Sequence, residues 1–474
     1  MNSESNAPSS RRCSPLLAWI RRHLRKPVTG LLLVFFSIWT VQVRGANLVW
    51  DSDGVSGAPT GGSGTWDTSS PLWDDAGSMI SWINGFNNTA IFGGTAGTVT
   101  LGGPISSGGL TFNANGYLLT GSTLTLGAPT GSNSPIIAVN NYVGNSPVNR
   151  ATISSLIAGT QGFTKLGNGA LVITGNNTGL SGDISIKQGS VVISSTSNLG
   201  AGSTAISVLG VAQTGTPGYS GGALVLQGAG AAAGAGMTLN REVSVAGRGP
   251  GAVNTTGGLV SVGYNTIAGG LTTGSIGAAE TRLMATHGAT TISGDVYLGA
   301  GSGTSGSTVF VGNGNWIISG QVGGNENIND RFVKSSGALI TSTLWLQNDA
   351  NNFLQAPRVD AGTIRVNTAG ALGSYVGTLS IDIQNGSFEL RTDAPAGFAS
   401  KNVIQRTNTS GGIVVDHDIS GPLGLSTSLQ NQTVQLGTLR SNLEFGKPGA
   451  TDEELWDVVE AVGLGDLVRG LPQG

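Results

Sequence analysis

The fold is decided by a glycine-punctuated stretch at residues 162–173, which reads GFTKLGNGALVI. It opens a unit at 162–193, and a second copy with weaker sequence similarity follows at 331–366. Repetition of this kind predicts a stacked architecture, because each unit buries its apolar side against its neighbours. The residues that define the repeat motif are Gly162, Phe163, Lys165, Gly167, Gly169, Leu171, Asn177, Gly182, Gly189, Phe332, Lys334, Asn352 and Gly362.

The composition extends this interpretation to most of the chain. Glycine accounts for 79 of 474 residues without a Gly-X-Y period, and only 10% of residues are charged. Short runs of aliphatic and polar residues alternate between Gly, Asn and Ser turns, as half-buried strands require. We therefore predict an all-β fold, a right-handed parallel β-helix over residues 96–436. An antiparallel sandwich or propeller is the alternative.

The first 45 residues predict a secretory signal peptide. Seven Arg or Lys and one Glu give them a charge of +6, and a short apolar run at 31–39 precedes small residues near Gly45. That order is typical of a signal peptide, and the alternative is a single membrane anchor. The only cysteine, Cys13, lies in this segment, so the mature chain is expected to have no disulfide.

Residues 46–95 predict an N-terminal β cap, since a solenoid must cover its open end. Flat indole rings also stack on sugars, so the alternative for this segment is a glycan contact. The tryptophans concerned are Trp50, Trp66, Trp73 and Trp82.

Charge limits the classes of partner. The whole chain carries −3, so removing the +6 of the first 45 residues leaves −9. An acidic remainder argues against nucleic acid, which calls for a basic patch. We expect the export machinery and a surface glycan or a host or neighbouring cell surface as partners. Membrane contact is expected only through the signal peptide or through a C-terminal anchor that the chain lacks.

The repeat at 162–193 resembles the autotransporter-associated β-strand repeat of exported proteins of Gram-negative and related bacteria. The tryptophan-rich opening at 50–112 is similar to the usual start of such proteins. The resemblance implies an exported structural or adhesive passenger-type protein, secreted or at the outer-membrane surface, whose repeats support secretion and folding. It supplies no catalytic residue and no cofactor. A carbohydrate-active β-helix enzyme, a polysaccharide lyase or hydrolase, is the alternative.

The sequence pattern of the tail at 437–474 differs from the strand pattern of residues 96–436. A capping box at 451–454 and apolar residues at helical spacing predict a helix. The segment is similar to part of the helical subdomain of an ABC-transporter ATPase, but the chain has no phosphate-binding Gly-x-x-x-x-Gly-Lys-Ser/Thr loop. We expect a truncated or joined reading frame here, the alternative being a helical cap.

Few residues offer chemistry of their own. The run Asp51-Ser52-Asp53-Gly54 resembles the start of a calcium loop but lacks the later glutamate, which favours a capped turn. The acids of Asp416-His417-Asp418 point opposite to the histidine on a strand, and His287 has no nucleophile beside it. Lys165 and Lys334 share one repeat position, where edge protection or pairing with a carbonyl is expected. No catalytic, cofactor or metal residue is assigned.

Overall fold

The computed structural model describes most of the chain that follows the predicted signal peptide. Of the predicted signal peptide at 1–45, only Gly45 is described, so Cys13 lies outside the described part. His417 and Asp418 lie outside it as well. The described ranges are 45–140, 150–202, 205–209, 221–228, 236–250, 257–274, 280–299, 307–324, 331–334, 342–354, 356–374, 381–383, 385–391, 403–405, 412–416, 450–461 and 465–469.

The strands form three faces, and each face gathers strands that are far apart in the sequence. The first face is a 13-stranded sheet: β1 (Asn47–Trp50), β3 (Trp73–Asp75), β4 (Ser78–Ile80), β5 (Thr89–Phe92), β8 (Gly109–Phe112), β11 (Ile136–Val139), β14 (Phe163–Leu166), β16 (Ile184–Ile186), β18 (Ile206–Leu209), β21 (Val243–Ala246), β24 (Leu271–Gly274), β27 (Val296–Leu298) and β30 (Val322–Gly324).

The second face is a 14-stranded sheet: β2 (Gly64–Trp66), β6 (Thr98–Leu101), β9 (Leu118–Gly121), β12 (Arg150–Ile153), β15 (Ala170–Ile173), β17 (Gly189–Ile193), β19 (Gly222–Gln227), β22 (Leu259–Val262), β25 (Thr281–Ala285), β28 (Ser307–Val311), β31 (Arg331–Lys334), β33 (Arg358–Val359), β35 (Ile381–Ile383) and β37 (Val403–Gln405).

The third face consists of a 3-stranded and an 8-stranded sheet: β7 (Ile105–Ser107), β10 (Leu124–Leu126) and β13 (Ile157–Ala158), then β20 (Thr238–Leu239), β23 (Asn265–Ile267), β26 (Ala289–Ile292), β29 (Asn315–Ile318), β32 (Thr343–Leu346), β34 (Thr363–Val366), β36 (Ser387–Arg391) and β38 (Gly412–Asp416). Between its two sheets, the 3₁₀ turn η1 (Thr196–Leu199) stands where the winding order calls for a strand.

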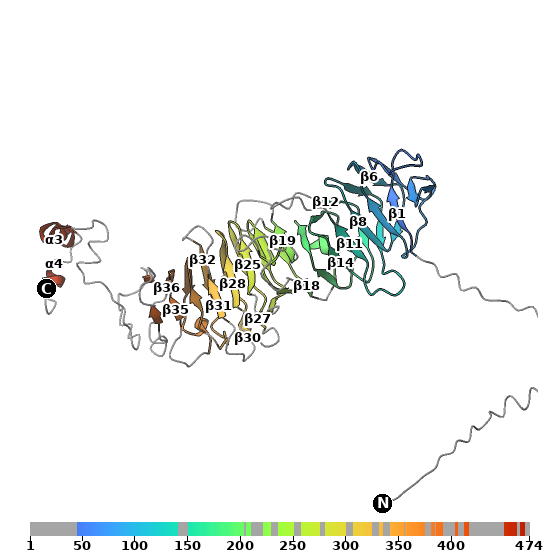
Figure 1. Cartoon of the computed structure of the whole chain (residues 1–474). Coiled ribbons are helices and arrows are strands. Elements are labelled where there is room, and N and C mark those ends of the chain that lie inside the picture. Colours follow the sequence, from blue (N-terminus) through green and yellow to red (C-terminus); the bar gives the residue numbers. More distant parts are fainter. Residues whose placement is uncertain are drawn as a thin grey trace, which may run out of the picture. The chain divides into compact units, whose positions relative to one another are not determined.

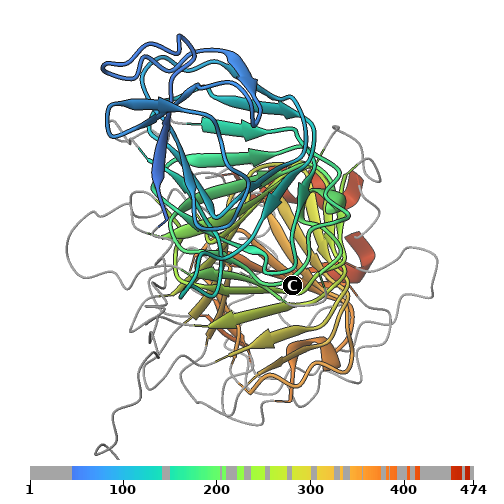
Figure 2. The ribbon, with the colours of Figure 1, turned by 90° about the vertical axis from the view of Figure 1, so that its right-hand side faces the viewer.

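From β5 onward every described strand pairs in parallel with the strand one coil away (Figure 1; Figure 2). These strands keep the order first, second, third face, but the third face has no described strand between β15 and β16 or between β17 and β18, and the first face has none after β30. The arrangement is a parallel β-helix, which confirms the predicted fold class. Only the pairs β1–β3 and β3–β4 are antiparallel among the described strands, so the sandwich and propeller alternatives are wrong.

The core consists of columns of side chains in register along each sheet. On the first face, Leu110, Ile137, Ile186 and Val208 belong to one buried column, in which Lys165 stands between Ile137 and Ile186. Burying one such aliphatic side chain contributes about 1.5–3 kcal/mol. Stability in a chain without a disulfide in its described part thus comes from columns that each coil extends.

The N-terminal end of the first face is closed by an antiparallel hairpin of β3 and β4. Because β4 is the outermost strand, the parallel strands behind it have no free edge at this end. At the other end of the chain, the helices α3 (Asp452–Ala461) and α4 (Gly465–Arg469) are formed. The predicted capping box is present, since the Glu454 amide donates to Thr451 Oγ1 at 3.3 Å and the Thr451 amide donates to Glu454 Oε2 at 3.1 Å.

Candidate functional site

Lys165 of the repeat lies inside the β-helix. In β14 its Cα partners are Ile137 and Ile186, so the lysine occupies a place in the buried aliphatic column of the first face. Its exposed fraction is 0%. A lysine is almost never buried in this way unless its ammonium group is paired.

The Lys165 ammonium group is held by backbone carbonyls. Nζ donates to the carbonyls of Leu166 at 2.7 Å, Gly167 at 2.8 Å and Gln188 at 3.1 Å, which joins the corner after β14 to the corner one coil later. In the described part of the chain no carboxylate forms an ion pair with it. Desolvation by burial lowers the pKa of Lys165 to about 7. Of the two roles expected for this lysine, the contacts match pairing with a carbonyl.

Glycines make room for these corners. A positive φ is found at Gly162, Gly167, Gly182, Gly189 and Gly362. At Gly189 φ is +64°, and a Cβ atom there would lie 2.3 Å from the carbonyl oxygen of Gly169. Any side chain at position 189 would therefore combine a left-handed backbone with a backbone clash.

A buried asparagine joins three coils in each copy of the repeat. Asn177 Oδ1 accepts from the Ile157 amide at 2.7 Å, and its Nδ2 donates to the Asn198 carbonyl at 2.6 Å. In the second copy, Asn351 Oδ1 accepts from the Val322 amide at 2.8 Å, and its Nδ2 donates to the Ala371 carbonyl at 2.9 Å.

The equivalent of Asn177 is thus Asn351 and not Asn352. Asn351 is 4% exposed, whereas its neighbour is on the surface. The assignment of Asn352 to the motif is wrong by one residue, because a pair of adjacent asparagines fits the sequence pattern in either register.

The two copies also lie on different faces of the β-helix. Phe163 and Lys165 belong to β14 on the first face, whereas Phe332 and Lys334 belong to β31 on the second face. The backbone register places Lys334 between the buried residues Phe310 and Val359. The side chains of β31 are outside the described part. The repeat therefore recurs after a rotation by one face.

The four N-terminal tryptophans pack against one another. Trp73 is in contact with the other three, with ring centroids 5.2 Å from Trp50, 4.9 Å from Trp66 and 4.8 Å from Trp82. All four are at most 1% exposed. None presents a ring face to solvent, so the glycan-contact alternative has no accessible indole at these positions.

The remaining chemical candidates form local contacts. Asp51 Oδ1 accepts from Thr60 Oγ1 at 2.8 Å, and Asp53 Oδ1 accepts from the Val55 amide at 2.8 Å, as in a capped turn. His287 Nδ1 lies 3.1 Å from Thr286 Oγ1. Asp416 ends β38, and its side chain lies outside the described part. The searched, described residues contain no group of three or more His, Cys, Asp or Glu that could hold a metal ion.

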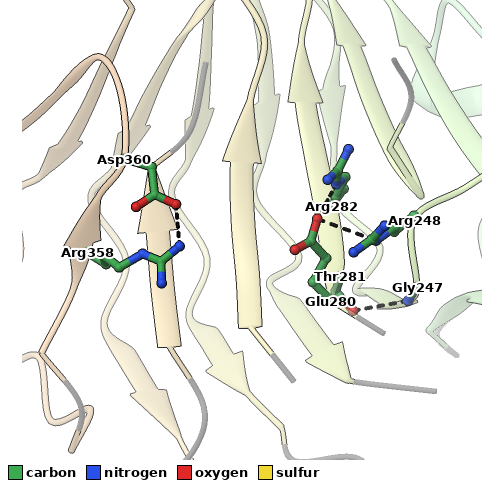
Figure 3. Close-up of polar contacts among 7 residues, drawn as sticks. All are labelled: Gly247, Arg248, Glu280, Thr281, Arg282, Arg358 and Asp360. Carbon is green, nitrogen blue, oxygen red and sulfur yellow. Dashed lines mark hydrogen bonds and ion pairs between the residues drawn. The ribbon is translucent and has the colours of Figure 1, made fainter. Parts of the chain in front are cut away.

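Charged groups on the second face are balanced locally. Figure 3 shows Glu280 between Arg248 and Arg282, with Arg248 Nε 3.4 Å from Glu280 Oε1, and Arg358 beside Asp360. Arg282 is buried, whereas the Arg358–Asp360 pair is partly exposed, and a partly exposed pair of this kind contributes at most about 1 kcal/mol. We interpret them as charge compensation on a face with few charges.

Sequence reasoning missed a set of residues on the outside of the third face. Trp345 in β32, Arg365 in β34 and Glu389 in β36 occupy neighbouring positions in register. They are 20 and 24 residues apart, and their proximity depends on the length of each coil. The only signal in the sequence was a tryptophan on a strand outside the cap.

Comparison with known proteins finds a similar adhesin. The chain is 32% identical over 447 residues to the adhesin BmaC autotransporter of Brucella suis biovar 1 (strain 1330). The aligned part covers 85% of this chain and 11% of that protein, so the chain spans a small part of its relative. No family model matches the chain, and no solved structure matches it.

This similarity supports an autotransporter passenger-like protein with a secreted or outer-membrane surface location in a Gram-negative bacterium. The comparisons give no support to the resemblance of residues 437–474 to an ABC-transporter ATPase. Within the described residues, no helix has the length and apolar character needed to cross a membrane.

Proposed function

We propose that this chain is an exported, adhesive passenger-type surface protein whose stacked repeats support its secretion and folding. The observation that carries the proposal is a parallel β-helix whose sequence is related, over 85% of its length, to an adhesin autotransporter. Within it, we propose residues 46–95 as the cap and 96–436 as the β-helix.

The internal bonding of the repeat supports a role in folding. Lys165 and Asn177 each join neighbouring coils through hydrogen bonds to the backbone. A coil that adds such bonds to the preceding one can fold in sequence order, as repeat arrays do when each unit contacts only its neighbours. A chain that emerges gradually from a membrane can use this property to fold outside the cell.

An adhesive role is favoured over catalysis. Sugar-cleaving enzymes place two carboxylates on either side of the scissile bond. Here, Asp53 accepts a hydrogen bond within a turn, and Glu280 and Asp360 pair with arginine. We therefore propose export machinery and a host or neighbouring cell surface as the partners.

The proposal is tested by following both location and adhesion of the full chain. Expression in a Gram-negative host is expected to give protein that external protease can digest in intact cells. Beads coated with the purified full chain are expected to bind epithelial or bacterial cells above beads coated with albumin. Retention inside the cell would contradict export, and equal bead binding would contradict adhesion.

The contribution of the repeat is tested separately. Deletion of residues 162–193 is expected to lower the secreted amount of protein or to leave it unfolded. The measurement is the ratio of extracellular to total protein, with the synthesis rate as the control. Normal secretion of a folded deletion variant would contradict the proposed role of the repeat.

A further inference from the structure

The outside of the third face carries an aromatic and polar surface in its C-terminal half. Trp345, Arg365 and Glu389 follow one another in register across β32, β34 and β36. Their neighbours Leu344, Ile364 and Phe388 are buried in the core. Since side chains alternate along a strand, this register places the three residues on the outer side of the sheet.

The indole ring of Trp345 is fixed in place. Its Nε1 donates to Asn367 Oδ1 at 2.8 Å, and the Arg365 guanidinium Cζ lies over the ring, 5.4 Å from its centroid. Arg365 Nε in turn donates to Glu389 Oε2 at 2.8 Å. These contacts hold one face of the ring against the guanidinium. No aromatic ring or cation of the described residues lies over the opposite face.

Polar groups around the ring have bonding capacity left. In the described part of the chain, the two terminal nitrogens of Arg365 and Nδ2 of Asn367 have no hydrogen-bond partner. Thr343 and Thr363 lie half-exposed at the neighbouring outward positions. The surface therefore combines an aromatic ring with several donors and hydroxyl groups.

We propose that this surface, formed by Trp345, Arg365, Asn367, Thr343 and Thr363, binds neutral pyranose units of a glycan. An indole face packs against the C–H face of a sugar ring, while fixed donors bind its hydroxyl groups. Glu389 balances the charge of Arg365, so an acidic sugar would meet a carboxylate as well as the cation. This balance favours a neutral glycan.

The burial of the other tryptophans on described strands leaves Trp345 as the candidate for stacking on a sugar ring. The four in the N-terminal cluster and Trp316 are buried. Trp345 is thus the partly exposed tryptophan among the described strands, and Trp456 on α3 is 37% exposed. Trp456 also lies against an arginine, Arg469, at 5.2 Å, which makes it a matched control outside the proposed surface.

The experiment is calorimetric titration of the full chain with neutral hexasaccharides derived from amylose, cellulose, mannan and galactan. Oligomers of hyaluronan and polygalacturonate serve as acidic probes. Binding of at least one neutral probe is expected, with Trp345→Ala weakening it at least tenfold and Trp345→Phe weakening it less. Trp456→Ala is expected to bind as the unchanged chain does. Circular dichroism verifies that each variant is folded.

Absence of binding to every neutral probe, stronger binding of the acidic probes, or unchanged affinity of a folded Trp345→Ala variant would overturn the inference. The inference rests on the proposed adhesive function, but it can be wrong while that function still holds. Cell-binding beads that keep their adhesion when coated with Trp345→Ala would leave the adhesive function in place and remove this surface as its basis. Absence of adhesion by the unchanged chain would instead count against the proposed function, whatever the glycan result.

Discussion

Asn177 and Asn351 make the same two hydrogen bonds in the two copies of the repeat. The backbone amides that donate to their Oδ1 atoms, however, belong to different faces of the β-helix. The Ile157 amide belongs to the third face and the Val322 amide to the first. Each asparagine joins the coil before it to the coil after it. This bonding pattern defines the repeat better than any single face of the β-helix does.

The first prediction concerns this asparagine. Asn351→Ala leaves the Val322 amide and the Ala371 carbonyl without their side-chain hydrogen-bond partner. We therefore expect a loss of about 2–4 kcal/mol in the free energy of unfolding. Asn352→Ala, one residue away on the surface, is expected to change it by less than about 0.5 kcal/mol. Urea unfolding measures the difference, and hydrogen exchange at the Val322 amide should accelerate only in Asn351→Ala. Equal effects of both substitutions would contradict the assigned register.

The second prediction concerns pH. Burial lowers the pKa of Lys165 to about 7, well below its value in an unfolded chain. Between pH 7 and 10 the unfolded chain therefore binds more protons at this lysine, and its contribution to stability rises with pH. The contribution is fully present only above the unfolded pKa, decreases as the pH falls from about 10 to 7, and is absent below 7. The expected gain is on the order of a few kcal/mol, since one pKa unit corresponds to about 1.4 kcal/mol.

Lys165→Met should remove this pH dependence, while the exposed Lys187→Met should retain it. The measurement is urea unfolding of the three proteins at pH 6.5, 8 and 9.5. A parallel rise of stability with pH in Lys165→Met would show that another group is responsible.

The third prediction concerns the cap. Trp73 is in contact with three other indoles, so Trp73→Ala opens a large cavity and is expected to cost about 3–5 kcal/mol. Near-ultraviolet circular dichroism should lose most of its tryptophan signal, because the remaining rings lose their closest neighbour. Trp456→Ala serves as the control, and a signal that survives in Trp73→Ala would contradict the packed cluster.

The fourth prediction concerns a glycine. Gly189→Ala places a methyl group 2.3 Å from the Gly169 carbonyl oxygen at a φ of +64°, and we expect a loss of about 1–3 kcal/mol. Gly103→Ala is the matched control, since nothing lies within 4 Å of a Cβ atom there. Thermal unfolding of both variants makes the comparison. A Gly189→Ala variant as stable as Gly103→Ala would exclude the close approach at this corner.

The fold was predictable because its determinants are local. The run at 162–173 contains strand, corner glycine and strand within twelve consecutive positions, and both the fold class and the carbonyl contacts of Lys165 could be anticipated from it. Adjacent asparagines at 351 and 352 left the register open by one residue. The surface around Trp345 and Arg365 could not be predicted, since their proximity depends on how many residues each coil contains.

The two copies of the repeat are offset by one face, so the smallest unit by which the β-helix can grow is a single strand with its corner. Because η1 can stand in place of a strand and the same motif serves on the first or the second face, a coil can lack the strand of one face while its strands on the other faces keep their parallel pairing. Genetic duplication then need not copy whole coils to remain in frame with the architecture. Divergent relatives would be expected to align by consecutive strands, with their surface residues moved around the axis from one protein to the next.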